Sequence, residues 1–265
     1  MYSFDYSRPG SVADAAKAAI ANPEARILAG GQTLVPVMKQ RLASPSAVID
    51  LGGIADLKTI TRDGNTLVIG AMMTHDAVAR SAEVKAAIPA LAALAGGIGD
   101  PAVRNAGTIG GSVANNDPAA DYASAVLALG ATIVTDKRQI AADQYFTGMF
   151  STALDAGEII TAIRFPIPKK AAYAKMEQRA SRYALVGAFV ADTSAGIRCA
   201  VTGCGGGGVF RSPEIEAALS ANFSADALKS VKISAANLMG DIHGSADYRA
   251  AMVPVMAARA VVAAG

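Results

Sequence analysis

The sequence is poor in the residues that build disulfide frameworks and metal centres. Its 265 residues include two cysteines, two histidines and no tryptophan. Cys199 and Cys204 cannot build a disulfide framework, and an iron–sulfur cluster usually needs four thiolate ligands. His75 and His243 have no cysteine or second histidine near them in sequence, which argues against a zinc site. We therefore expect no metal site in this chain, and we expect both cysteines to be buried or loop thiols.

Blocks of charge and long apolar runs are also missing. The chain has 24 basic and 22 acidic residues, a formal net charge of +2, and no Lys/Arg cluster that could neutralise a run of phosphates, so nucleic acid is not expected as a partner. The most apolar stretches, residues 85–100 and 121–136, fall short of the roughly 18 residues that a spanning helix needs. Residues 1–6 lack the apolar core of a secretory signal. These absences predict no transmembrane segment and a cytoplasmic protein.

Apolar residues, in contrast, are abundant. They make up 52% of the chain, and charged residues make up only 17%. This composition excludes a disordered protein and predicts a packed globular one. At roughly 100 to 200 residues per domain, the length predicts two modest domains or one large one.

The first part of the sequence alternates predicted strands and helices around glycine turns. Ser11 begins a capping pattern, and Asp63-Gly64 suits a tight hairpin. Glycines and a proline punctuate residues 98–112, which predicts a long loop, and loops of this length inside a domain are usually functional. The expected elements are a helix from Ser11, strands at 25–28 and 47–51, a helix at 33–42, paired strands within 57–69, helices at 74–88, 89–97 and 118–129, and a strand at 131–135.

Prolines mark the next boundary. Residues 158–165 are predicted to form an edge strand that ends at Pro166 and Pro168, and the following Lys-Lys pair completes the predicted domain boundary. Beyond it, strands precede helices, which is typical of an α+β domain. The elements expected there are strands at 172–177, 185–193 and 197–202 and helices at 213–219, 225–239 and 245–264.

Three glycine clusters are candidate ligand sites: Gly30-Gly31, Gly107–Gly111 and Gly203–Gly208. The third contains a formal G-x-G-x-x-G pattern, but the helix that a dinucleotide fingerprint needs is delayed, so a plain connection is favoured. Consecutive glycines let backbone N–H groups converge on an anion, and the first two clusters together could clamp a pyrophosphate.

Polar side chains next to these two clusters could add contacts. Thr33 and Ser112 could donate hydroxyl groups, while Asp117 and Asp121 could accept hydrogen bonds from sugar hydroxyls. Each feature also has an ordinary explanation, because a double glycine is often a simple turn and an aspartate after a loop is often a helix cap. Residues alone leave both interpretations open.

Two segments resemble the FAD motifs of a known family. Residues 29–34, Ala-Gly-Gly-Gln-Thr-Leu, resemble the first motif, and residues 108–112, Thr-Ile-Gly-Gly-Ser, the second motif, of the flavoprotein subunits of molybdenum hydroxylases. These are the medium subunit of carbon monoxide dehydrogenase and the FAD domain of xanthine dehydrogenase. The resemblance extends over the whole chain, through residues 4–9, 100–105, 117–121, 173–179 and 245–249.

The resemblance implies an α+β fold like that of the vanillyl-alcohol oxidase (PCMH) type. An FAD-binding domain at 1–166, made of two α+β subdomains near 1–55 and 56–166, would precede a C-terminal α+β domain of antiparallel sheet and helices at 167–265. Lys175 would lie near the flavin as a favourable cation, and Tyr183 would shield its ring or simply pack in the core. The implied cofactor-binding residues are Ala29, Gly30, Gly31, Gln32, Thr33, Leu34, Thr108, Ile109, Gly110, Gly111, Ser112, Asp121, Lys175 and Tyr183.

The resemblance also implies a function that needs no catalytic side chain in this chain. FAD would pass electrons from 2Fe-2S clusters of a small partner subunit to an external acceptor, such as quinone, NAD or oxygen. A large molybdopterin subunit would oxidise the substrate, which could be carbon monoxide, an aldehyde, a purine or another N-heterocycle. A dimer of heterotrimers is implied. Two alternatives stay open: a flavin-free assembly module, and a free-standing FAD oxidase.

Overall fold

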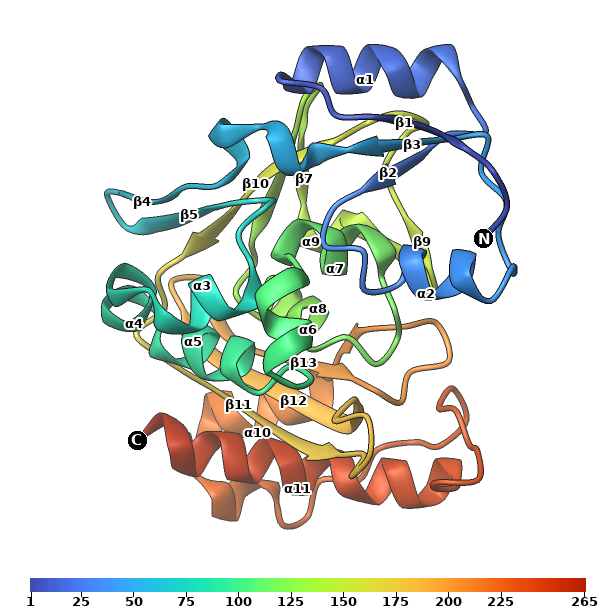
Figure 1. Cartoon of the computed structure of the whole chain (residues 1–265). Helices are drawn as coiled ribbons and strands as arrows, with labels where there is room; N and C mark the ends of the chain where they lie inside the picture. Colours follow the sequence, from blue (N-terminus) through green and yellow to red (C-terminus); the bar gives the residue numbers. More distant parts are fainter.

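Three main β-sheets follow one another along the chain, and helices separate the second from the third (Figure 1). The computed structural model describes residues 1–265. The first sheet lies at the top of Figure 1 and the third, with the C-terminal helix, at the bottom. The second sheet and its helices therefore lie between the first sheet and the third.

The first sheet is small and parallel, with the strand order β1-β3-β2. Helix α1 begins after Ser11, whose hydroxyl accepts the Asp14 N–H at 3.1 Å, as the capping pattern predicts. Ala15 of this helix packs against Ile49 of the sheet in a small core. The elements are β1 (Asp5–Ser7), α1 (Val12–Ala21), β2 (Arg26–Leu28), α2 (Leu34–Lys39), β3 (Ala47–Asp50) and the 3-10 turns η1 (Leu51–Gly53) and η2 (Ala55–Leu57).

The second sheet is antiparallel and has the order β4-β5-β10-β6-β7. The prediction of an edge strand at 158–165 was wrong, because β10 is the central strand and pairs on both sides. Pro166 is the last residue of the strand and pairs only with β5, where a missing N–H does little harm, and Ile163 and Phe165 are fully buried. The strands are β4 (Ile60–Asp63), β5 (Thr66–Gly70), β6 (Thr132–Thr135), β7 (Gln139–Ala141) and β10 (Ile160–Pro166).

Helices cover this sheet, and two of them replace the long loop predicted at 98–112. Asp100 caps α6 by accepting the Val103 N–H at 2.8 Å, and Pro101 occupies the first helical position. This Asp-Pro helix start was overlooked because the many glycines of the segment suggested a loop. The predicted helix at 74–88 is divided in two at Ser81, whose side chain caps the second half. The helices are α3 (His75–Arg80), α4 (Ala82–Ala87), α5 (Pro89–Gly96), α6 (Pro101–Ala106), α7 (Ile109–Asn115), α8 (Asp121–Ala128) and α9 (Ala142–Tyr145).

The third sheet is antiparallel, in the order β11-β12-β13-β14. The helix predicted at 225–239 is only a 3-10 turn capped by Ser224, because the chain beyond it carries β-branched Val231 and Ile233 in irregular backbone. The elements are β11 (Lys170–Glu177), β12 (Ala184–Thr193), β13 (Gly196–Thr202), β14 (Phe210–Arg211), α10 (Pro213–Ala221), η3 (Ala225–Leu228) and α11 (Ala246–Ala264); a hairpin of β8 (Phe146–Gly148) and β9 (Ser151–Thr152) was not predicted.

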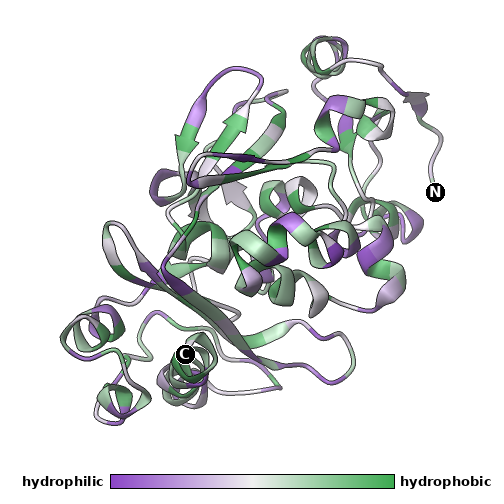
Figure 2. Cartoon of the chain, turned by 90° about the vertical axis from the view of Figure 1, so that its left-hand side faces the viewer, coloured by the Kyte–Doolittle hydropathy of each residue, from purple (hydrophilic) through white to green (hydrophobic).

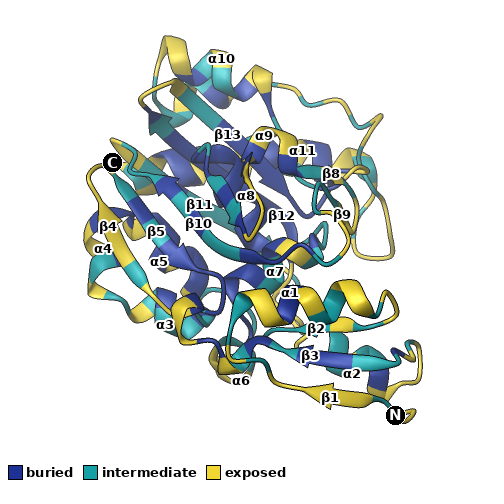
Figure 3. Ribbon diagram, turned by 90° about the horizontal axis from the view of Figure 1, so that it is seen from above, coloured by how far each residue is buried: buried dark blue, intermediate teal, exposed yellow.

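The central core joins the second and third sheets. All eight residues of α8 are buried, and Phe189 and Ala200 of the third sheet belong to the same apolar cluster as the middle helices. Figure 3 shows this buried centre, and Figure 2 shows hydrophobic residues, in green, along the helices in the middle of the molecule. The outer face of the third sheet packs against α10 and α11. None of the helices combines the length and the apolar character that a membrane span requires.

The third glycine cluster is a connection, as predicted. Residues 203–208 lead from β13 into β14, an antiparallel neighbour, and not into a helix. Both cysteines are buried, and burial raises the pKa of the Cys204 thiol to about 12. The pKa of Cys199 is raised for the same reason, so both thiols are protonated and unreactive at neutral pH.

Candidate functional site

A cavity of about 740 Å³ lies where the first sheet meets the middle helices and the β11–β12 turn. Its volume is within the roughly 300–1,000 Å³ of ligand pockets. It is lined by all the predicted site residues except Ile109 and Lys175. Residues from distant parts of the sequence therefore meet around one space.

The two glycine motifs touch each other on the cavity wall. A side-chain carbon at Gly30 would lie only 2.6 Å from the Gly107 Cα, and one at Gly111 would lie 3.3 Å from the Ala29 Cβ. Glycine is required at these contacts because the two backbones approach too closely for a side chain at Gly30. The prediction that the motifs form one site is supported by this packing.

The first motif presents unpaired backbone donors. The N–H groups of residues 30–34 form no hydrogen bond within the chain. Gly31 has φ +70°, a left-handed conformation that favours glycine and turns the backbone at this point. The Thr33 hydroxyl is unpaired too, and this residue precedes α2 without capping it. Successive free N–H groups of this kind form an anion-binding concavity.

Most backbone donors of the second motif are already paired within the chain. The Ile109 N–H donates to the Met73 carbonyl at 3.0 Å, and the Gly110 N–H donates to the Ala71 carbonyl at 2.9 Å. The Gly111 N–H donates to the Thr108 hydroxyl at 3.1 Å. The expectation that both motifs offer converging N–H groups was therefore wrong for the second one. Ile109 is fully buried in the core, so the motif forms a wall instead.

Asp121 lies on a third wall of the cavity and is held from behind. Its carboxylate accepts hydrogen bonds from the Tyr173 hydroxyl at 2.5 Å and from the Lys175 ammonium at 3.2 Å. Burial raises the pKa of Asp121, while Lys175 and Tyr173 act in the opposite direction.

Lys175 does not line the cavity. Its ammonium also donates to the Gly97 carbonyl at 2.9 Å and to the Arg182 carbonyl at 2.8 Å, which uses its three N–H donors. The lysine therefore ties the β11–β12 turn to the end of α5 and to Asp121. Lys175 was predicted to lie near the cofactor, but the structure connects it to the cavity only through its hydrogen bond to Asp121.

Two further carboxylates of the wall share one cation. Glu158 is bridged by the Arg138 guanidinium at 2.9 Å, and this hydrogen-bonded ion pair lowers the pKa of the carboxyl group to about 2. Asp155 lies 3.4 Å from the same guanidinium. Asp117, the other carboxylate of the wall, has no cation beside it and accepts the Ala119 N–H at 2.8 Å, so the negative charge of the wall is neutralised only in part.

Tyr183 stands at the rim of the cavity and is 48% exposed. It follows Arg182, whose φ of +61° is unusual for a residue with a side chain. The turn is closed by the Gln178 N–H, which donates to the Tyr183 carbonyl at 2.9 Å. Partial burial raises the pKa of the tyrosine, so its phenol stays neutral. Core packing, the alternative considered for this residue, does not describe a half-exposed ring.

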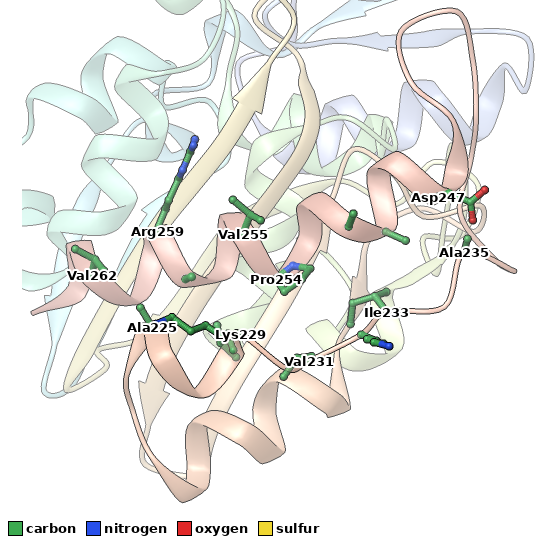
Figure 4. A pocket seen from close by; sticks show the side chains of 15 residues that line it. Ala225, Lys229, Val231, Ile233, Ala235, Asp247, Pro254, Val255, Arg259 and Val262 are labelled. Atoms are coloured by element: carbon green, nitrogen blue, oxygen red, sulfur yellow. The ribbon is translucent and has the colours of Figure 1, made fainter.

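A second cavity, of about 820 Å³, lies between α11 and the segment that follows η3 (Figure 4). Its walls are mostly aliphatic, with Val231, Ile233 and Pro254 among them. It contains neither glycine motif and none of the predicted site residues. The glycine-lined cavity is therefore the candidate functional site.

Comparisons with known proteins identify the family. Residues 2–168 match the family described as the FAD binding domain in molybdopterin dehydrogenase. The carbon monoxide dehydrogenase medium chain of Afipia carboxidovorans is 37% identical, covering 98% of this chain and 96% of its own. The chain belongs to the FAD-binding medium subunits of the molybdenum hydroxylases.

Further relatives agree with this assignment. The nicotine 6-hydroxylase medium subunit of Paenarthrobacter nicotinovorans is 35% identical, covering 98% of this chain and 96% of its own. A solved structure of carbon monoxide dehydrogenase from Hydrogenophaga pseudoflava, which lacks the Mo-pyranopterin moiety of the molybdenum cofactor, has a TM-score of 0.90 at 34% identity. The match covers 99% of this chain and 97% of that one. The α+β FAD-binding fold and the oxidoreductase class expected from the sequence are confirmed.

The cavity of this FAD-binding subunit fits its cofactor. A pyrophosphate needs several donors, and residues 30–34 offer five unpaired N–H groups. The paired carboxylates nearby are compensated, and the close approach of Gly30 to Gly107 leaves no side chain between the motifs. The donor set is thus made mainly of backbone and not of cationic side chains.

Sequence reasoning missed two parts of the cavity wall. Arg182 lies next to Tyr183, but nothing in the sequence signals its left-handed backbone. His75 was considered only as a metal ligand, although it also lines the cavity. The scarcity of histidine in the chain, together with the position of this one directly after the capping residue Thr74, could have indicated it.

Proposed function

We propose that this chain is the electron-transfer flavoprotein subunit of a molybdenum-containing hydroxylase or dehydrogenase complex. Its FAD would receive electrons from 2Fe-2S clusters of a small partner subunit and pass them to an external acceptor, such as quinone, NAD or oxygen. A large molybdopterin subunit would oxidise the substrate, and two such heterotrimers would form the complex. The medium-subunit names of the relatives support this assignment.

The observation that carries the proposal is the run of five unpaired N–H groups at residues 30–34 on the cavity wall. These donors, with the hydroxyls of Thr33 and Ser112, would hold the pyrophosphate. The closely packed second motif, residues 108–112, would position the first, and Asp121 would accept hydrogen bonds from polar groups of the nucleotide. Tyr183 would cover the exposed end of the flavin.

FAD, when bound, accepts or gives one or two electrons, so it can join one-electron carriers to two-electron acceptors. The residues of this chain bind and orient the cofactor and keep the charge around it balanced. The two buried cysteines are too few to hold a cluster of four thiolates, so we assign the iron–sulfur centres of the proposed complex to another chain. No side chain of this subunit is assigned as nucleophile or general acid.

The proposed domain division follows the same scheme. FAD binding is assigned to residues 1–166, with subdomains near 1–55 and 56–166, and the C-terminal domain to residues 167–265. The last strand of the second sheet ends at Pro166 and the first strand of the third sheet begins at Lys170, which supports a boundary between them.

The test is to prepare the chain alone and with its partner subunits, and to quantify the flavin released on denaturation. We expect one FAD per chain. A chemically reduced iron–sulfur subunit, freed of excess reductant and mixed anaerobically with the flavin-loaded chain, should bleach the flavin absorbance. A folded chain without flavin in either preparation would support the assembly module instead, and a loaded flavin that the reduced partner cannot bleach would contradict the electron route.

A further inference from the structure

His75 is a buried titratable group on the cavity wall to which the proposed function gives no task. Its side chain lines the cavity, and the residue is only 5% exposed. The ring forms no hydrogen bond within the chain, and its Nδ1 is buried without a partner. A buried polar atom left without a partner costs about 1–3 kcal/mol, and such atoms are rare in folded proteins.

The ring is fixed beside the two glycine motifs. The His75 N–H donates to the Gly107 carbonyl at 3.0 Å, and Thr74 forms an isolated β-bridge with Thr108. A side-chain carbon at Gly107 would lie 2.6 Å from the His75 Nε2, so the imidazole occupies the space on that side of the glycine. Gly30 packs against the same residue, which brings the free donors of the first motif close to the ring.

The ring is neutral at physiological pH. Burial, assisted by the positive charge of Arg104, lowers the pKa of His75 to about 4. A neutral imidazole carries one N–H donor and one acceptor nitrogen. Its aromatic neighbour is Tyr122, at a ring-centroid distance of 5.4 Å, but the Tyr122 hydroxyl has no partner in the chain either. The two side chains therefore do not satisfy each other.

We propose that His75 contacts the bound cofactor directly, through a hydrogen bond between its Nε2, which is unpaired and is not enclosed as Nδ1 is, and an oxygen of the polar chain of FAD. This oxygen belongs to the pyrophosphate or to the ribityl group, because the ring adjoins the backbone donors and not the β11–β12 turn at the cavity rim. The inference rests on FAD binding in this cavity, and it does not depend on the route of electrons through partner subunits.

The experiment measures the FAD dissociation constant of the full chain, alone or in the complex in which it retains flavin. The variants are His75→Gln, His75→Asn and His75→Phe, because a glutamine amide can replace Nε2, whereas an asparagine amide reaches only the position of the buried Nδ1. We expect His75→Phe to weaken binding about tenfold or more, as the loss of one hydrogen bond predicts. His75→Gln should restore most of the affinity, and His75→Asn should not.

His243→Gln is the matched control, because His243 is the other histidine of the chain and is exposed. Its affinity for FAD should equal that of the unsubstituted chain. If His75→Phe folds and binds FAD as tightly as that chain, the inference is wrong.

A second measurement needs no variant of His75. The ¹⁵N chemical shifts of the imidazole nitrogens, recorded before and after addition of FAD, should change for His75 and stay constant for His243. Constant shifts at His75 would overturn the inference even if the phenylalanine variant does not fold.

Fragments of the cofactor distinguish the two kinds of oxygen. If the contact is a pyrophosphate oxygen, His75→Phe should lose affinity for ADP and keep its affinity for riboflavin. A ribityl contact predicts the reverse, and unchanged affinity for both fragments would contradict a contact to the polar chain. If the partner cannot reduce the flavin although FAD affinity is intact, the proposed electron route is wrong, but the inference about His75 still holds.

Discussion

The two glycine motifs of the cavity have similar compositions, but their backbones are in opposite states. In the first motif, residues 30–34 keep five N–H groups free on a partly exposed turn. In the second, the N–H groups of residues 109–111 are paired with the carbonyls of Met73 and Ala71, just after β5, and with the hydroxyl of Thr108. The first motif is therefore arranged to receive a ligand, and the second to hold the first in place.

The difference teaches that a glycine motif cannot be interpreted from composition alone. Gly30 and Gly110 are both intolerant of a side chain, but their neighbours differ: Gly30 contacts the other motif, whereas Gly110 contacts Ala71 in the core. Substitution should therefore impair binding in the first motif and folding in the second. Four predictions test this separation.

The largest effect is expected for Gly110→Ala. The new methyl carbon would lie 2.5 Å from the Ala71 Cβ and 2.7 Å from its carbonyl oxygen, at a fully packed position. We expect a loss of about 3 kcal/mol in the free energy of unfolding, measured by urea denaturation of the flavin-free chain. Gly207→Ala is the control, because no atom lies within 4 Å of its added carbon. Equal stability of the two variants would contradict the structural task of the second motif.

The next effect is the loss of FAD from Gly31→Asp. A carboxylate beside the unpaired donors should weaken FAD binding about a hundredfold by repelling the pyrophosphate. Stability should fall by only about 1 kcal/mol, because aspartate tolerates a positive φ better than most residues. Gly31→Asn has nearly the same size and no charge, so it should retain most of the affinity. If both variants lose FAD equally, the cause is steric, and the anion-binding assignment is wrong.

The stability of the chain should depend on pH through His75, which packs beside Gly107. Because its folded pKa of about 4 lies below the ordinary value of 6.5, the unfolded chain binds the proton more tightly. The contribution of His75 to stability is therefore complete above pH 6.5 and falls as the pH decreases toward 4, by about 3 kcal/mol. His75→Phe should show a shallower decline in urea denaturation over this range. A parallel decline in both chains would mean that other groups cause it.

The smallest effects are expected for the paired threonines. Thr108→Val removes the hydroxyl that accepts the Gly111 N–H and should cost about 1 kcal/mol of stability, as for other N-caps. Thr33 caps nothing, so Thr33→Val should leave the melting temperature unchanged and weaken FAD binding only about threefold. Thermal melting and FAD titration of both variants check this. A loss of stability in Thr33→Val and of FAD affinity in Thr108→Val would mean that the two motifs have the opposite roles.

The sequence predicted the elements whose signals are local. The Ser11 cap, the hairpin at Asp63-Gly64 and the strands of the third sheet depend on nearby residues, and the structure confirms them. The central position of β10 could not be predicted, because strand order depends on contacts between distant segments. The helix at 101–106 was missed because glycines outweighed a clear Asp-Pro start.

The site was predictable as a set of residues but not as a set of interactions. The resemblance named the residues that meet around the cavity, and FAD as the cofactor is confirmed by the family. Their individual contacts to FAD stay predictions. The occupied donors at Ile109 and Gly110 depend on carbonyls some forty residues earlier in the chain, and no motif records that pairing.

Lys175 gives the β11–β12 turn a chemical reporter. Its ammonium has all three donors engaged and its side chain is only 10% exposed, whereas Lys169, at the other end of β11, is 73% exposed. A reagent that acylates amines should therefore label Lys169 at once and reach Lys175 only when the turn opens. The labelling rate of Lys175 would therefore report how often the turn opens, and bound flavin that holds the turn closed should lower this rate further.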